Sequence, residues 1–239
     1  TACPADMPDK LYAQWTRPVT LDKQGGSGGS DSTSQLYKTG ETSSYPYRAV
    51  TPPTTPPSGS PGGWRFLGYC DYNPSTSPGG NVYQMIKSDG TSTGRAYSST
   101  TLYAWWVKPV SLNKNASDAT AGATTSVWAL KGAKLGYACS TTASTEAEIR
   151  AKFPSSSPLK ATGWAPTRPD RAFIGYSSFA IDTGGTLYVD AAGNGQVAVD
   201  ANCPDTLNAR WGYTVTFDKM GGSGGTDSVD VEFDSHVPE

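Results

Sequence analysis

The residues best suited to chemistry in this 239-residue chain are its four cysteines and its single histidine. The cysteines are Cys3, Cys70, Cys139 and Cys203, and no two of them are close enough in sequence to form a CxxC metal or redox motif. The histidine, His236, lies three residues from the C-terminal residue, so a mixed cysteine–histidine zinc site is not expected. We therefore expect neither a metal site nor a cofactor.

The number and spacing of the cysteines favour disulfide bonds. An even, widely spaced set is typical of two disulfides and of an oxidising compartment. Four cysteines allow three connectivities, and the sequence alone does not choose among them. Their positions relative to the repeat described below favour pairing Cys3 with Cys70 and Cys139 with Cys203. Four free buried thiols in a cytosolic protein are the alternative.

The acidic and hydroxyl residues show no arrangement typical of an enzyme. The chain has 21 Asp and Glu residues, but none lies in a distinctive pair of the kind that a glycosidase needs. A Ser-His-Asp triad would have to use His236, and no GxSxG motif accompanies it. Asp182 and Asp190 lie in turn sequences that lack the ligand number of an EF-hand. We expect the protein to be non-catalytic.

Composition favours a mainly β (α+β) fold. The 27 glycines, 18 prolines and 13 tyrosines indicate short strands joined by many turns, and 36% apolar residues suit small cores along an elongated molecule. Only 17% of residues are charged and the net charge is −2, so no nucleic-acid partner is expected. No apolar run reaches about 18 residues, so no membrane insertion is expected. Few short helices are predicted, the clearest at Ser144–Lys152 with Ser144 or Thr145 as N-cap.

Three similar segments reveal an internal repeat. They begin at Leu11 (LYAQWTRPVTLDK), Leu102 (LYAWWVKPVSLNK) and Leu207 (LNARWGYTVTFDK), and the first and third continue into GGSGGSDS and GGSGGTDS. Between them, FLGY at 66–69 matches FIGY at 173–176. The predicted organisation is the end of a preceding repeat (1–15), repeat unit 1 (16–106), repeat unit 2 with a Cys139 and helix insertion (107–211), and the opening strand of a further partial repeat (212–239).

Residues that recur in every period are interpreted as scaffold, because a recurring residue more often seals a core than binds a ligand. Apolar and polar residues alternate after each recurring tryptophan, which predicts a half-buried strand. The scaffold residues are Trp15, Trp106, Trp211, Val19, Val110, Val215, Tyr69 and Tyr176. The tryptophans that do not recur are the better candidates for ligand contact: Trp64, Trp105, Trp128 and Trp164.

In their order along the chain, these motifs resemble the internalin B-repeat (Listeria–Bacteroides repeat) of bacterial surface proteins. The resemblance is carried by Val215–Gly224, Pro52–Pro61, Trp64–Cys70, Gly79–Ser92 and Thr101–Trp106. It covers nearly the whole chain, although unit 2 has NASDATAGATT in place of the GGSGG turn. The resemblance implies small β-grasp-like domains arranged end to end, an extracellular location on a bacterial surface, a structural or adhesive role, and no catalytic residues.

The half-units at the two ends suggest how such a protein assembles. The closing strand Leu11–Trp15 and the opening strand Tyr213–Asp218 would each expose an edge, and exposed edges favour strand addition. We hypothesise a stalk or filament subunit whose partners are copies of itself, joined head to tail. The alternatives are that these are arbitrary ends of an excised fragment, or that the terminal strands cap the array. The alternative function is an adhesin module that binds a host or cell-surface protein or glycan.

Overall fold

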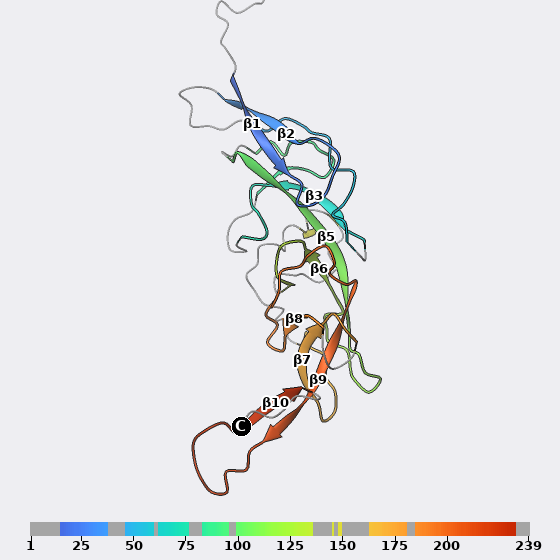
Figure 1. The fold of residues 1–239 in the computed structure, drawn as a ribbon, viewed down its shortest axis with the longest axis vertical. Helices are drawn as coiled ribbons and strands as arrows, with labels where there is room; N and C mark the ends of the chain where they lie inside the picture. Colours follow the sequence, from blue (N-terminus) through green and yellow to red (C-terminus); the bar gives the residue numbers. More distant parts are fainter. Residues whose placement is uncertain are drawn as a thin grey trace, which may run out of the picture.

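The computed structural model describes residues 15–37, 46–59, 62–76, 83–95, 99–135, 145, 148–149, 163–180 and 185–232. These residues form an elongated, mainly β structure with β1 at one end and the C-terminal hairpin at the other (Figure 1). The prediction of a mainly β fold is confirmed.

The described residues contain ten strands in one sheet. They are β1 (Trp15–Asp22), β2 (Ser32–Tyr37), β3 (Arg65–Cys70), β4 (Gln84–Ile86), β5 (Thr101–Asn113), β6 (Ser126–Leu130), β7 (Ala172–Ser177), β8 (Leu187–Asp190), β9 (Thr206–Thr216) and β10 (Ser228–Glu232). The main path of the sheet is β2-β1-β5-β9-β7-β8, and β10 pairs with β9. β3 pairs with both β4 and β5, while β6 pairs with β5.

The two longest strands, β5 and β9, change partners along their length. β5 begins parallel to the end of β1, continues antiparallel to β3, and finishes antiparallel to β6. β9 begins parallel to the end of β5, then pairs antiparallel with β7 and finally with β10. The predicted unit boundaries, after Trp106 and after Trp211, fall inside these strands. A continuous strand therefore crosses each predicted boundary.

The burial pattern of β5 explains why it can serve two sets of partners. Its C-terminal part alternates, with Val110 and Leu112 buried and Ser111 and Asn113 exposed, as expected for a sheet with one covered face. Its middle part is buried at every residue, because successive side chains point to opposite faces and both faces are covered here. The alternation therefore indicates where the sheet has one covered face and where it has two.

Two apolar clusters occupy these faces. Trp106 lies in the larger one, which also contains Val19, Val110 and Trp211. Its neighbour Trp105 points the other way and enters the smaller cluster. The smaller cluster consists of Leu67, Cys70, Trp105, Val107, Leu130, Ala133 and Ile149, with Tyr72 and Trp128 packed against it.

The predicted helix is described only in part. Glu148 and Ile149 are helical, and the remainder of Ser144–Lys152 apart from Thr145 lies outside the described residues. The Glu148 carboxylate accepts hydrogen bonds from the backbone N–H and the hydroxyl of Thr145, both at 2.9 Å. The Thr145 hydroxyl accepts in return from the Glu148 N–H at 3.3 Å, which completes a capping box. Thr145 is thus the N-cap, and the helix turns the buried Ile149 into the smaller cluster.

Candidate functional site

Two of the recurring tryptophans make the same contact in different parts of the chain. The indole Nε1 of Trp106 donates to the Lys23 carbonyl at 2.9 Å, and that of Trp211 donates to the Lys114 carbonyl at 3.0 Å. Both rings are only 2% exposed. Each indole therefore connects its strand to a turn much earlier in the chain. The acceptor lies 83 residues before Trp106 and 97 residues before Trp211.

An aromatic cluster surrounds Trp106. The Phe66 ring centroid lies 5.1 Å from that of Tyr69 and 5.3 Å from that of Trp106. The hydroxyl of Tyr69 is buried and has no hydrogen-bond partner within the described part of the chain. Burial, aided by the carboxylates of Asp31 and Asp22, raises the pKa of Tyr69 to about 12. Tyr69 therefore acts as a neutral core residue rather than as an acid or base at physiological pH.

A corresponding cluster surrounds Trp211. The Phe173 centroid lies 5.1 Å from Tyr176 and 5.8 Å from Trp211. Trp164 packs on its other side, 5.6 Å from Phe173 and 6.1 Å from Tyr176. Burial raises the pKa of Tyr176 well above its ordinary value. Trp164 is therefore a core residue of this cluster, contrary to its prediction as a ligand-contact residue.

The other tryptophans predicted for ligand contact also pack inward. Trp105 is buried, and its Nε1 donates to the Tyr72 carbonyl at 3.1 Å. Trp64 is buried, and Trp128 is half-buried against the smaller cluster. A sugar ring needs an exposed aromatic face to stack on. Trp64 and Trp105 offer none, so the prediction fails for them, and Trp128 offers a reduced one.

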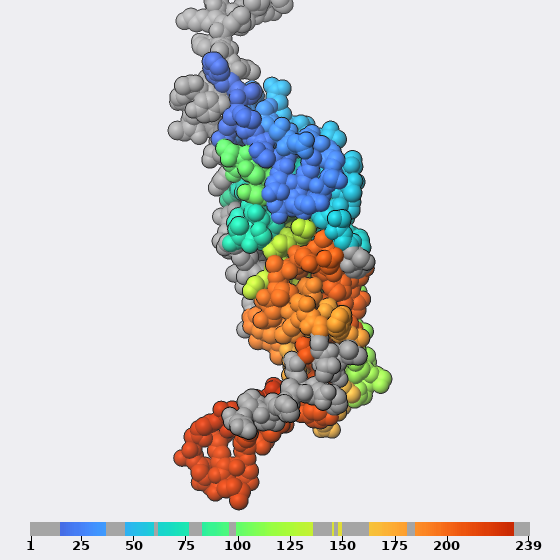
Figure 2. Space-filling view, in the orientation of Figure 1, coloured from blue at the N-terminus to red at the C-terminus, as the bar shows by residue number. Residues whose placement is uncertain are grey.

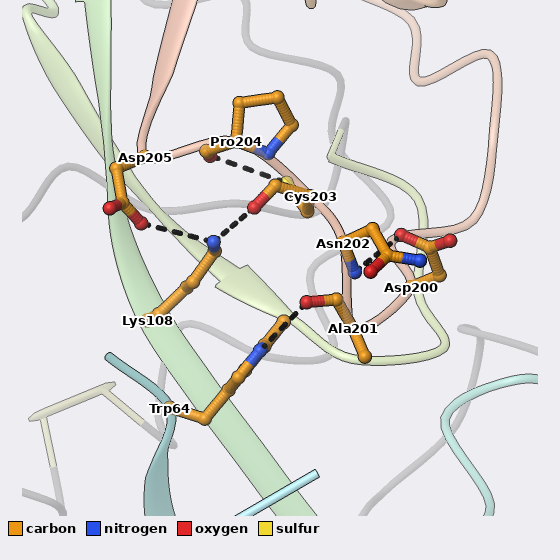
Figure 3. A network of polar contacts seen from close by, with 8 residues as sticks. All are labelled: Trp64, Lys108, Asp200, Ala201, Asn202, Cys203, Pro204 and Asp205. Carbon is orange, nitrogen blue, oxygen red and sulfur yellow. Dashed lines mark hydrogen bonds and ion pairs between the residues drawn. The ribbon is translucent and has the colours of Figure 1, made fainter. Parts of the chain in front are cut away.

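A buried lysine joins the N-terminal and C-terminal parts of the structure (Figure 3). The side chain of Lys108, on β5, is fully buried, and its Nζ donates to the Cys203 carbonyl and to Asp205 Oδ1, the latter at 3.1 Å. The same Nζ lies 5.3 Å from the centre of the Trp64 ring, a cation–π distance. Trp64 Nε1 in turn donates to the Ala201 carbonyl at 3.3 Å. Because a buried cation is stable only with such partners, these contacts hold the segment before β9 against the N-terminal part.

Cys203 does not have the surroundings of a reactive thiol. Cys203 is a buried free thiol whose Sγ lies 3.6 Å from the Pro204 carbonyl, and burial raises its pKa to about 11. A thiol that stays protonated at neutral pH is a poor nucleophile. The structure thus does not support the predicted disulfide at Cys203. Cys70 is buried, while Cys3 and Cys139 lie outside the described residues, so the Cys3–Cys70 pairing stays a prediction.

Two glycine-rich turns, which follow the first and the third repeated segments, share one backbone conformation. We number them by their segments and call residues 22–31 turn 1 and residues 218–227 turn 3. In turn 1, Asp22 Oδ1 accepts from the N–H of Gln24 at 2.8 Å, and Gln24 has a φ of 52°. In turn 3, Asp218 Oδ1 accepts from the N–H of Met220 at 2.9 Å, and Met220 has a φ of 47°. Local hydrogen bonds therefore build both turns in the same way.

The surroundings of the two turns differ. A methyl group added at Gly26 of turn 1 would lie 2.5 Å from Cζ2 of Trp106, so the ring rests directly on that glycine. At Gly222 of turn 3 the same methyl group would approach only the Lys219 carbonyl, at 3.1 Å. Turn 3 thus has the backbone of a tryptophan site without a tryptophan in it.

Exposed apolar side chains lie at both ends of the molecule. Trp15 is 62% exposed, although it was predicted to be scaffold like Trp106. Beside turn 3, Phe217 is 41% exposed, whereas Leu21, at the same place beside turn 1, is 4% exposed. The predicted scaffold residue Val215 is half-buried. The other six predicted scaffold residues are buried: Trp106, Trp211, Val19, Val110, Tyr69 and Tyr176.

Comparison of the chain with protein-family models, with curated proteins and with solved structures finds no match to any of them. The resemblance to the internalin B-repeat therefore rests on its motifs alone. Within the described ranges, no three His, Cys, Asp or Glu side chains gather as a metal ion would require. No helix in those ranges is long and apolar enough to span a membrane.

Proposed function

We propose that this protein is an extracellular structural protein of a bacterial surface, a non-catalytic stalk or filament subunit made of tandem β-grasp-like units. The observation that carries the proposal is the continuity of β5 and β9, each of which pairs with strands on both sides of a predicted unit boundary. A strand shared in this way leaves successive units no free linker about which to swivel.

The pairing registers support the tandem arrangement. The parallel ladder between β1 and β5 starts at Thr20 opposite Thr101, and that between β5 and β9 starts at Ser111 opposite Thr206. Positions 20 and 111 differ by 91 residues, as do the tryptophans at 15 and 106. Positions 101 and 206 differ by 105, as do the tryptophans at 106 and 211. The spacing of the sequence repeat is thus also the spacing of these ladders.

The contacts around Lys108 support stiffness at the first boundary. Its ammonium group bridges β5 to the segment that leads into β9, and Trp64 reaches across to the same segment. These contacts oppose bending about β5, since bending would leave a buried charge without partners. A stiff, elongated particle is what a stalk requires.

Assembly into longer filaments would use the ends of the molecule, with copies of the protein as partners. β1 and the C-terminal end of β9 lie at opposite ends of the molecule (Figure 1). The exposed side chains of Trp15, the first residue of β1, and of Phe217, the residue after β9, supply apolar surface for such contacts. The adhesin alternative gains no support, because three of the four tryptophans proposed to bind a ligand are buried.

Small-angle X-ray scattering of the dilute monomer tests the stalk proposal. We expect a profile of one rigid, elongated particle, and Lys108→Ala should broaden the distribution of conformations. The exposed-site substitution Lys87→Ala serves as the matched control for loss of a lysine. A compact particle, or two bodies that move independently in the unmodified protein, would contradict the proposal. Antibody labelling of intact cells tests the surface location.

A further inference from the structure

Turn 3 has the form of a binding site for an aromatic residue. We propose that it accepts Trp15 of a second copy of this chain, with the indole Nε1 of Trp15 donating to the Lys219 carbonyl. This inference rests on the proposed head-to-tail assembly and names the contact that would hold it together. Turn 3 is already formed, the apolar side chains beside it are exposed or half-buried, and the chain carries a matching tryptophan that lies too far away to reach it within one copy.

Turn 3 is formed without its tryptophan. The N–H of Gly222 donates to the Lys219 carbonyl at 2.8 Å, and in turn 1 the N–H of Gly26 donates to the Lys23 carbonyl at 3.0 Å. The Lys219 ammonium also pairs with Asp227 across the turn. In turn 1 the Lys23 carbonyl accepts the indole of Trp106 as a second hydrogen bond. A carbonyl oxygen has two lone pairs, so the Lys219 carbonyl can do the same.

The apolar side chains beside turn 3 are exposed or half-buried. Figure 2 shows the C-terminal hairpin standing out from the body of the molecule at one end. Phe217 is exposed there and Val215 is half-buried, whereas their counterparts in β1, Leu21 and Val19, are buried. A two-stranded hairpin with exposed apolar residues is marginally stable in water and gains stability when it is covered. The site therefore favours an apolar occupant.

Trp15 is the residue of this chain that matches the site. It occupies the position of Trp106 and Trp211 in the repeated segment, and in each case a valine follows four residues later. The other two rings are buried on a turn, whereas Trp15 is exposed. Both internal contacts thus serve as templates for the contact that we propose between copies.

The contact that we propose joins two copies of the chain. Trp15 begins β1 at one end of the long axis, and turn 3 lies beyond β9 at the other end (Figure 1). One copy can therefore not close the contact on itself. Because the donor and acceptor surfaces differ and lie at opposite ends, the contact is head to tail and can continue through many copies.

The test uses one variant that lacks the donor and one that lacks the acceptor. Trp15→Ala removes the donor, and Gly222→Leu fills the acceptor with a side chain at the place where a ring would lie. Both positions are exposed, and the glycine has no positive φ, so both variants should fold. Phe179→Ala and Gly62→Leu are the matched controls, since Phe179 is an exposed aromatic elsewhere and Gly62 has open space around it.

Sedimentation velocity should show association of the unmodified protein that grows with concentration. Each variant alone should associate more weakly, by on the order of thirtyfold in Kd, as expected for a central tryptophan contact. The two controls should behave like the unmodified protein. An equimolar mixture of the two variants should form heterodimers and nothing larger, because only one donor and one acceptor remain intact.

Three results would overturn the inference. A protein that stays monomeric at every concentration excludes the contact, while an elongated scattering profile would leave the stalk function standing. Association that survives both substitutions places the contact elsewhere and leaves filament assembly standing. A mixture of the variants that associates no better than either variant alone shows that the two positions do not meet.

Discussion

Turn 1 and turn 3 have nearly the same sequence and the same backbone, yet turn 1 is half-covered by distant segments and turn 3 is exposed almost throughout. Their first glycines, Gly25 and Gly221, have φ values of 88° and 90°. Turn 1 is covered by Trp106 and by the proline-bearing segment 51–57, whereas no described residue comes within 4 Å of a methyl group placed on Gly224 or Gly225 of turn 3. The difference shows that residues within the turn determine its shape, while distant segments determine its burial.

The proline-bearing segment 51–57 is a distant segment that covers turn 1. Ser27 forms a bridge with Thr55, and a methyl group on Gly29 would lie 2.3 Å from the Pro52 carbonyl. Turn 1 requires a glycine at position 29 for two reasons. Its φ of 65° is strained for other residues, and the Pro52 backbone lies too close for a side chain. In turn 3 only the positive φ requires a glycine at the corresponding position, because no described residue approaches it closely.

The largest difference between the two turns should follow from loss of the tryptophan ring. Trp106→Ala should lower the free energy of unfolding by about 3–5 kcal/mol, because it removes a buried ring and leaves a cavity over turn 1. Trp15→Ala should change it by less than about 0.5 kcal/mol in the monomer, since its ring is exposed. Urea denaturation at low protein concentration measures both. Equal effects would show that the two rings have similar surroundings in solution.

The next effect concerns the glycine under the ring. Gly26→Ala should destabilise the protein by about 1–3 kcal/mol, because its methyl group would overlap Trp106. Gly222→Ala meets only the Lys219 carbonyl and should cost less than about 1 kcal/mol. The same denaturation experiment checks the pair. If Gly222→Ala proved the more damaging of the two, turn 3 would already be filled in the monomer.

A smaller effect should depend on pH, because the carboxylates of turn 1, Asp31 and Asp22, add to the rise in the pKa of the buried Tyr69. The pKa of Tyr69 is raised to about 12 by burial, so its neutral form stabilises the folded state. That contribution is complete below the unfolded pKa of about 10 and is lost as the pH rises through about 12. Tyr69→Phe should reduce the loss of stability over this range. At neutral pH it should be nearly neutral, since the hydroxyl has no partner among the described residues.

Two measurements follow this tyrosine. Phenolate absorbance during an alkaline titration should show one fewer late-titrating group in Tyr69→Phe, and urea midpoints should record the change in stability. An unchanged alkaline slope in the variant would show that other buried groups, such as Tyr176 and Cys203, dominate the loss of stability.

The smallest effect, and the one expected to be equal in both turns, concerns the lysine–aspartate pairs. Lys23 pairs with Asp31 in turn 1, and Lys219 pairs with Asp227 in turn 3. Both aspartates are largely exposed, so Asp31→Asn and Asp227→Asn should barely move the urea midpoint. High salt should abolish any remaining difference in urea midpoint between these variants and the unmodified protein. A large effect in turn 1 alone would show that its pair is shielded from solvent by the covering segments.

The sequence predicted those features that local patterns encode. The alternation after the first two tryptophans correctly predicted that Val19 and Val110 are buried, and of the two N-cap candidates, Ser144 and Thr145, the structure shows Thr145 in that role. The mainly β fold followed from composition, because short strands and many turns need β-branched and aromatic residues with glycine and proline between them.

The features that escaped prediction depend on contacts between distant segments. Trp105 and Trp106 are adjacent and similar, and nothing local indicates that both faces of β5 are covered at that point. The burial of Lys108 depends on carbonyl and carboxylate acceptors more than 90 positions later in the chain, with separations of 95 and 97. Trp15 has the motif of a buried residue, but its burial requires a turn that the described residues do not bring to it.

The shared strand β5 also governs how the molecule loses its structure. Its N-terminal residues complete the sheet with β1 and β3, and its C-terminal residues complete it with β6 and β9. If one part unfolded alone, β5 would lose its hydrogen bonds to that part while it remained paired with the other part. Heating should therefore melt the two parts in one cooperative transition, so that damage on one side of Trp106 is felt on the other.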